Sequence, residues 1–255
     1  MKRILLCVAY DGTDYCGFQA QDNVRTIEGE LNKALSELHN ETITVIGASR
    51  TDAGVHALAN MAVYDTSARM PGEKVSFALN TRLPEGIRIV WSREVPAGFH
   101  PRHMLTAKTY EYHIYNDEFM PPTKRLYTYH YNRPLDVFKM NEAAKALIGE
   151  HDFKSFCSVK TTAETTVRNI IDVSVQKEGS EVIITVKGNG FLYNMVRIIA
   201  GTLIEVGIGR IAPESVKDIL NACDREAAGP TAPAHGLLLA KFEFCEENAF
   251  CDEKC

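Results

Sequence analysis

The most constraining feature of this chain is an order of element patterns that occurs twice: a strand, a helix and then paired strands. In the first half, residues 3–10 are rich in Ile, Leu and Val, as in a buried strand. A helix follows, because Thr26 can cap it and apolar residues recur at helical spacings from Ile27 to Leu38. The remaining patterns predict strands at 42–47, 61–64 and 87–91, and a short helix before Asn80.

The second half follows a similar order, with no repeat at the level of individual residues. Residues Lys108–Tyr115 alternate cleanly and are rich in tyrosine, which predicts a strand. Apolar residues from Met140 to Ile148 form a helix face that Gly149 stops. The later patterns predict strands at 167–176 and 181–187 with a Glu178-Gly179 turn, an apolar helix at 193–206, a short helix opened by Pro213, and a last strand at 237–244.

This order predicts an α+β fold made of two related α/β subdomains with largely antiparallel sheets and helices on their outer faces. We expect an N-terminal domain at 1–105 and a C-terminal domain at 106–244. Residues 245–255 form an acidic tail that we expect to be disordered.

Composition narrows the class of protein. No apolar run approaches the roughly 18 residues that a membrane helix needs. The short apolar stretch at the start turns polar at residues 11–14 and lacks a convincing cleavage site, so we expect a first strand and not a signal peptide. The net charge is −5, but residues 243–255 alone hold five acids and one lysine, so the remaining body is close to neutral. A near-neutral body can still carry a basic face for nucleic acid.

The cysteines favour a reduced, cytoplasmic protein over a disulfide framework. There are seven, an odd number, and none forms a C-x-x-C pair. Cys245, Cys251 and Cys255 cluster at the end of the chain, but their spacing fits no standard zinc pattern. Metal capture by this tail stays a minor alternative, and elsewhere we expect no metal and no cofactor.

The run with the most specific chemistry is Gly47–Ala57, with the sequence GASRTDAGVHA, which follows a predicted strand. Arg50 and Asp52 are two positions apart, so in an extended segment they share one side. A neighbouring arginine keeps a carboxylate ionised and fixes its direction, which suits an anion that attacks or abstracts. A structural turn with an Arg–Asp bridge explains the same spacing, and by spacing alone it is the more common case.

This run resembles the hallmark R-T-D-A-G-V-H-A of the tRNA pseudouridine synthase A family. The segment Tyr10–Gln19 looks like the opening motif of that family, Y-D-G-x-x-Y-x-G-[FW]-Q. The segments Phe99–Arg102 and Lys108–Tyr112 match its central section, and Phe191–Arg197 is similar to its F-x-x-x-M-V-R. Together the similarity covers about residues 3–244. Asn60 and Ser49 depart from it, since many members have glutamine and glycine there.

The resemblance implies an isomerase that needs no cofactor and converts uridine to pseudouridine at positions 38, 39 and 40 of the tRNA anticodon stem-loop. Asp52 would be the catalytic nucleophile in the N-terminal domain. In the C-terminal domain, Tyr110 would contact the flipped base and accept its C5 proton, directly or through water. Arg50 and Arg197 would orient and charge-pair Asp52, at a central active-site cleft around which the two subdomains are joined.

The resemblance also implies a homodimer that binds tRNA. Basic side chains should line an RNA groove, although each alone is more often a solvated surface charge. The expected substrate contacts are Tyr110, Arg25, Lys108, Arg168 and His56, with Lys124 and Arg125 as further candidates. His56 is more simply explained as a residue that orders its loop than as an acid or base.

Two other classes of function compete with this one. A non-catalytic RNA-binding or chaperone protein has no need for an ionised carboxylate beside arginines. A glycosidase normally requires a second catalytic Asp or Glu, and none occurs in the matching motifs.

Overall fold

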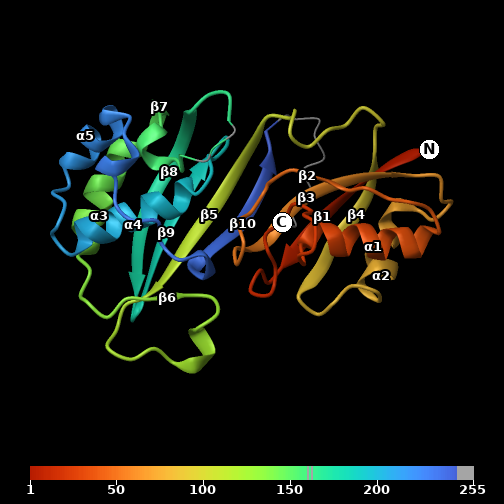
Figure 1. The fold of residues 1–255 in the computed structure, drawn as a ribbon, viewed down its shortest axis with the longest axis horizontal. Helices are drawn as coiled ribbons and strands as arrows, with labels where there is room; N and C mark the ends of the chain where they lie inside the picture. The colour runs from red at the N-terminus through yellow and green to blue at the C-terminus, as the bar shows by residue number, and fades with distance from the viewer. Residues whose placement is uncertain (160, 162, 246–255) are drawn as a thin grey trace. The chain divides into compact units, whose positions relative to one another are not determined.

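The structure is a computed structural model, and it describes residues 1–159, 161 and 163–245. It comprises two compact units (Figure 1). Of the described residues, the first contains 1–105 together with 239–245, and the second contains those within 106–238.

The first unit is a mostly antiparallel sheet with two helices. Its strand order is β4-β1-β3-β10, and the short β2 pairs with β3. Helix α2 packs on β4, and α1 contacts α2. The bounds are β1 Lys2–Tyr10, α1 Ile27–His39, β2 Ile46–Gly47, β3 His56–Thr66, α2 Gly72–Asn80, β4 Ile87–Val95 and β10 Leu237–Phe244.

A hydrophobic cluster explains why the end of the chain belongs to the first unit. Phe242 and Phe244 pack with Leu5, Met61 and Phe99 in one buried core. The rings of Phe99 and Phe244 meet edge to face with centroids 5.5 Å apart. The expected second domain, 106–244, therefore differs from the second unit in its last strand, because an apolar strand pattern does not say which sheet the strand joins.

The second unit has the sheet order β5-β9-β8-β7, all antiparallel, with β6 parallel to β5. Helices α3, α4 and α5 group together in Figure 1, and α3 packs on both α4 and β8. The strands are β5 Thr106–Tyr115, β6 Tyr129–His130, β7 Gly149–Asp152, β8 Val167–Glu178 and β9 Glu181–Gly188. The helices are α3 Val137–Ala144, α4 Met195–Gly207 and α5 Ser215–Ala222, with 3-10 turns at 122–124, 145–147, 154–156, 225–227 and 234–236.

The expected α+β class with largely antiparallel sheets is confirmed, and so are most of the expected elements. The strand expected at 42–47 is wrong except for its last two residues. The N–H groups of Ile43 and Val45 donate to the Ser36 and Asn32 side chains of α1, at 2.9 and 2.8 Å, so this segment follows the helix instead of the sheet. The short strands β6 and β7 were not predicted, because two to four polar residues carry no readable period.

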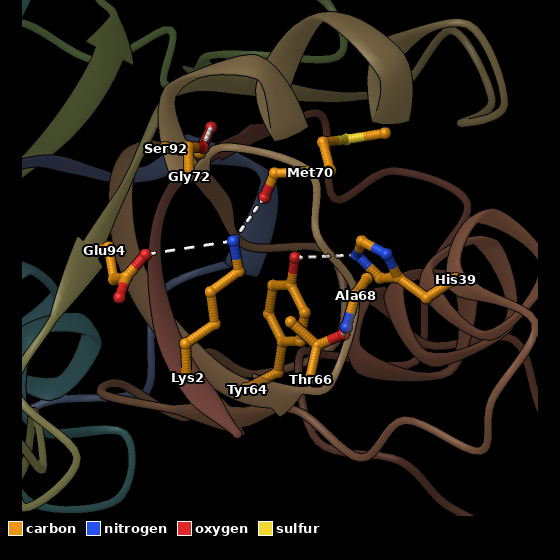
Figure 2. A network of polar contacts seen from close by, with 9 residues as sticks. All are labelled: Lys2, His39, Tyr64, Thr66, Ala68, Met70, Gly72, Ser92 and Glu94. Atoms are coloured by element: carbon orange, nitrogen blue, oxygen red, sulfur yellow. Dashed lines mark hydrogen bonds and ion pairs between the residues drawn. The ribbon is translucent and has the colours of Figure 1, made fainter.

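A polar network ties the far end of the first unit's sheet to its helices (Figure 2). The Tyr64 hydroxyl on β3 lies 3.0 Å from Nε2 of His39, the last residue of α1. Lys2 on β1 bonds to the Met70 carbonyl and lies 3.8 Å from the carboxylate of Glu94. These contacts connect the start of β1 and the later part of β3 to the end of α1 and to the segment before α2.

None of the described helices has the length and apolar character needed to cross a membrane. The expected acidic tail beyond Cys245, with Cys251 and Cys255, lies outside the described residues. Cys245 follows the last strand, and its N–H donates to the Leu105 carbonyl at 2.9 Å.

Candidate active site

The run Gly47–Ala57 forms the connection between β2 and β3, with residues 48–55 outside both strands. Within it Arg50 is exposed, Thr51 is buried and Asp52 is half-buried. This alternation puts Thr51 on the inner side of the loop and Arg50 and Asp52 on the outer side, as their two-residue spacing predicts. We call residues 48–55 the aspartate loop.

A buried hydroxyl pair anchors the inner side of the aspartate loop. Thr51 Oγ1 lies 2.7 Å from the hydroxyl of Tyr10, the last residue of β1. The Thr51 carbonyl accepts a hydrogen bond from the N–H of Phe18 at 3.1 Å. Thr51 separates Arg50 from Asp52 in the chain, so these bonds fix the backbone from which both charged side chains extend.

The side-chain amide of Asn60 holds the start of the same loop. Its Oδ1 accepts from the Ser49 N–H at 3.2 Å, and its Nδ2 donates to the Ser49 carbonyl at 3.0 Å and to the Tyr10 hydroxyl at 3.2 Å. Asn60 is fully buried. Inside a protein, polar groups with all their bonds made hold one arrangement strongly, because leaving any of them unpaired is costly.

The opening segment 10–19 packs on the aspartate loop at distances that only glycine permits. A Cβ on Gly12 would lie 2.1 Å from the Val55 carbonyl oxygen. Gly17 has φ +92°, in the left-handed region, and a Cβ there would lie 2.8 Å from the Thr51 carbonyl oxygen. Two motifs about 40 residues apart in the sequence therefore form one substructure.

His56 belongs to the same substructure, at the first position of β3, where its side chain is buried. Its Nδ1 accepts a hydrogen bond from the Gly12 N–H at 3.0 Å and lies 3.2 Å from Asp11 Oδ1. Through these contacts His56 links the start of β3 to the Asp11–Gly12 turn.

Arg102 is a residue of this site that the sequence analysis did not single out, although it ends the matched segment Phe99–Arg102. Its Nε donates to the Gly47 carbonyl at 2.7 Å, at the entry to the aspartate loop. Shielding from water, and then the positive charge of Arg50, hold the pKa of Arg102 below its ordinary value. Two guanidinium groups therefore stand near one loop, which favours an anion there.

The positive charge of Arg25 is partly neutralised by a neighbouring carboxylate, which the sequence analysis did not predict. Its Nε donates to the Glu30 carboxylate at 2.6 Å, and its guanidinium lies 4.8 Å from the ring centroid of Tyr15. The bond to Glu30 raises the pKa of Arg25. An RNA phosphate would have to compete with Glu30 for this side chain.

In the second unit, Tyr110 lies on β5 and is 7% exposed. Its ring meets Phe191 edge to face, with centroids 5.0 Å apart and an interplanar angle of 81°. Phe191 opens the matched segment 191–197, so the contact brings two more of the motifs together. The rigid aromatic pair holds the Tyr110 ring in one orientation.

Arg197 lies in the first turn of α4, where a positive charge opposes the helix dipole. The residue before the helix, Asn194, has φ 62° and makes no side-chain cap bond. Its Oδ1 instead accepts from Arg197 at 2.8 Å, and the Ala232 carbonyl accepts from Arg197 Nε, also at 2.8 Å. The Asn194 side chain thus binds the Arg197 guanidinium instead of capping the N-terminus of α4. Departures of this kind from local sequence preference are expected at functional sites.

Lys108 and Arg168 lie on the second unit's sheet. Lys108 is half-buried on β5, opposite Gly188 of β9. Arg168 donates from one terminal nitrogen to the carbonyls of Thr165 and Val167, at 3.0 and 2.6 Å. Burial lowers the pKa of Arg168. The first unit thus contains four of the expected site residues, Asp52, Arg50, His56 and Arg25. The second unit contains the other four, Tyr110, Arg197, Lys108 and Arg168.

Within the described part of the chain, no group of three or more His, Cys, Asp or Glu side chains could hold a metal ion. The first unit offers a carboxylate beside arginines, and the second unit offers a tyrosine in contact with Phe191 and a guanidinium held by Asn194 and Ala232. These groups can move protons and stabilise charge at an organic substrate.

Comparison with known proteins identifies the family. A family model described as tRNA pseudouridine synthase matches residues 6–103 and 143–244. The chain is 49% identical over 239 residues to "tRNA pseudouridine synthase A" of Brevibacillus brevis, covering 94% of this chain and 98% of that protein. It is 48% identical to the protein of that name from Halalkalibacterium halodurans, covering 93% and 91%. The Bacillus subtilis protein of that name is 44% identical, with 93% and 97% covered.

The matches to these relatives extend over nearly the whole chain, and the family model spans the segments 10–19, 47–57, 99–102 and 191–197, so the expected family is confirmed. Its members are isomerases that convert uridine to pseudouridine in tRNA. The chain belongs to the tRNA pseudouridine synthase family.

Proposed function

We propose that this protein is a tRNA pseudouridine(38–40) synthase that isomerises uridine in the anticodon stem-loop, with Asp52 as the catalytic nucleophile. The observation that carries the proposal is the construction of the aspartate loop. Buried bonds from Tyr10, Asn60 and Phe18 fix its inner side, while its outer side offers Asp52 next to Arg50. A loop built only as a turn would not need so many buried polar contacts to present one carboxylate.

The reaction breaks the bond between N1 of uracil and C1′ of the ribose and forms a bond between C5 and C1′. N1 gains a proton and C5 loses one, so no oxidant, reductant or group donor is required. Asp52 acts at the sugar, either by attacking C1′ or by removing the 2′ proton. Both routes need an ionised carboxylate, which Arg50, Arg102 and Arg197 favour.

Tyr110 acts at the base in this proposal. The target uridine leaves its stack, at a cost of a few kcal/mol, and its base is held in a pocket. The Tyr110 ring is fixed by Phe191, so it can stack on the uracil and take the C5 proton, directly or through water. Arg197, held by Asn194 and Ala232, supplies positive charge to Asp52 during the reaction.

The remaining parts of the proposal concern binding. Lys108, Arg168 and His56 are proposed to contact or shape the RNA site, and Arg25 to do so in competition with Glu30. We propose that the protein works in the cytoplasm as a homodimer on one tRNA.

The test is tritium release from tRNA transcribed with C5-labelled uridine. The unchanged protein should release tritium, and Asp52→Asn should release none while its dissociation constant for tRNA changes little. Asp22→Asn is the matched control, because Asp22 is an exposed aspartate of the same unit, and it should keep full activity. Full activity in Asp52→Asn would refute the role of Asp52, and a lack of release from the unchanged protein would refute the enzyme assignment.

A further inference from the structure

A pocket of about 400 Å³ lies in the second unit, between the start of α3 and the end of α4. Its lining includes three cationic residues, Arg133, Lys139 and Arg210, and the proposal above gives none of them a role. The rest of the lining is Pro134 and residues 207–209. We call this the basic pocket.

The three cations keep donors available for a ligand. Arg133 is exposed and forms no ion pair with any residue in the described ranges. Arg210 uses one terminal nitrogen on the Glu205 carboxylate, at 3.1 Å, which leaves most of the five N–H donors of the guanidinium unused. Lys139 lies 3.5 Å from Asp136, too long for a strong bond. A multidentate anion such as a phosphodiester suits this set, because its two non-bridging oxygens match the planar donor fork of a guanidinium.

The backbone around the basic pocket is well fixed. The Asp136 N–H donates to the Gly207 carbonyl at 2.9 Å, which joins the start of α3 to the end of α4. The last carbonyls of α4 accept from the N–H groups of residues 208–211, so the negative end of the helix dipole is satisfied within the chain. The carbonyls of residues 204–207 are therefore all engaged by N–H groups of the chain.

Aromatic rings accompany these cations. Tyr131 is half-buried and stands two positions before Arg133 in the chain. Phe138, the neighbour of Lys139 on α3, is 90% exposed. Cations interleaved with accessible aromatic rings are typical of surfaces that bind RNA, where the cations follow the backbone and the rings stack on bases.

We infer that the basic pocket binds a backbone phosphate of the tRNA, as a contact separate from the one at the target uridine. The inference rests on the proposed function. Arg197 and Gly207 lie at opposite ends of α4, ten residues and therefore about 15 Å apart. The same helix thus carries Arg197 at one end and borders the basic pocket at the other. One RNA can therefore be held at two points.

The test uses Arg133→Gln, because among the described residues Arg133 has no ion partner whose loss could disturb the fold. Binding of tRNA is measured by fluorescence anisotropy at several salt concentrations. The slope of log affinity against log salt should fall by about 1, and binding should weaken for all tRNAs alike. Lys217→Gln is the matched control, since it removes the same charge from an exposed position on α5 and should change neither quantity.

Three results would overturn the inference. One is an unchanged salt slope in both Arg133→Gln and Arg133→Gln/Lys139→Gln. Another is a calorimetric signal for inorganic phosphate that Arg133→Gln abolishes while tRNA binding stays the same, which would assign the basic pocket to free phosphate. A third is a changed oligomeric state in sedimentation with an unchanged slope, which would assign it to a protein contact. Asp52→Asn reports on chemistry and Arg133→Gln on binding, so failure of one leaves the other intact.

Discussion

The hydroxyls of Tyr10 and Thr51 lie 2.7 Å apart in the interior of the first unit, although 41 positions separate them in the chain. Tyr10 ends β1, and Thr51 stands between Arg50 and Asp52. Asn60 donates to the same Tyr10 hydroxyl and also holds the backbone of Ser49. The contact therefore joins the sheet to the aspartate loop at Thr51, the residue that precedes the proposed nucleophile in the chain.

Tyr10→Phe should lower the rate of the chemical step more than it weakens tRNA binding. The change removes a partner from Thr51 and from Asn60, both buried, at a cost of about 1–3 kcal/mol of folding stability. It also frees the aspartate loop to move, and displacement of a reacting group slows catalysis strongly. Single-turnover kinetics and urea unfolding measure the two effects.

Tyr64→Phe is the control for that experiment. Tyr64 is a buried tyrosine on β3 that loses one hydroxyl contact, with His39, at the far end of the strand (Figure 2). It should lose stability as Tyr10→Phe does but keep the single-turnover rate. Equal loss of rate in both variants would show that stability alone explains the effect of Tyr10.

Tyr110→Phe should still bind tRNA, but its rate of tritium release from C5 should fall by roughly a hundredfold or more relative to the unchanged protein. A positioned proton acceptor contributes about that much to the rate. Tyr112→Phe is the comparison. Tyr112 is two residues along the same strand, and its hydroxyl donates to the Pro233 carbonyl at 2.8 Å, so its loss should affect stability and leave release unchanged. Normal release from Tyr110→Phe would reduce Tyr110 to a stacking surface.

Asn194→Gly should lower turnover by about tenfold or more, and its cost in folding stability should not exceed that of the one hydrogen bond that it removes. Glycine accepts the left-handed backbone at this position, with φ 62°, but cannot bond to Arg197. Hydrogen bonds to charged groups are worth about 1.5–3 kcal/mol, which sets the size of the effect. Asn40→Gly provides the control, since Asn40 is also left-handed, with φ 53°, and ends α1 instead. Unchanged turnover in Asn194→Gly would argue against the orientation of Arg197 by Asn194.

Folding stability should depend on the protonation of His39. Burial lowers the pKa of His39 below its ordinary 6.5, with Glu41 opposing that shift and Lys2 adding to it. Between the folded-state pKa and 6.5 the unfolded chain binds a proton that the folded chain does not, so stability should fall as the pH drops through this window and be complete above it. Urea unfolding from about pH 5 to 8 measures this, and His39→Gln should flatten that part of the curve. An identical pH dependence in both proteins would contradict the assignment.

Much of the fold could be predicted because its long elements carry strong periods. The helix capped by Thr26, the strands β5, β8 and β9, and the apolar helix α4 all follow from spacing and turn residues. Segments whose hydrogen bonds go to side chains could not be predicted. Residues 42–45 have a strand composition, yet the Asn32 and Ser36 side chains take their N–H groups.

The sequence by itself determined the family, the α+β class and the residues expected to carry the chemistry, because these depend on residue types at fixed spacings along the chain. The tertiary structure decided which residues support them. The contact with the Gly47 carbonyl gives Arg102 its role at the aspartate loop. Asn60 has a role there because it binds the backbone of Ser49, and Asn194 has its role because it binds Arg197. The basic pocket likewise combines residues some 70 positions apart in the chain. Hydrogen bonds and charges act through space, so a local sequence pattern cannot predict which distant residues they bring together.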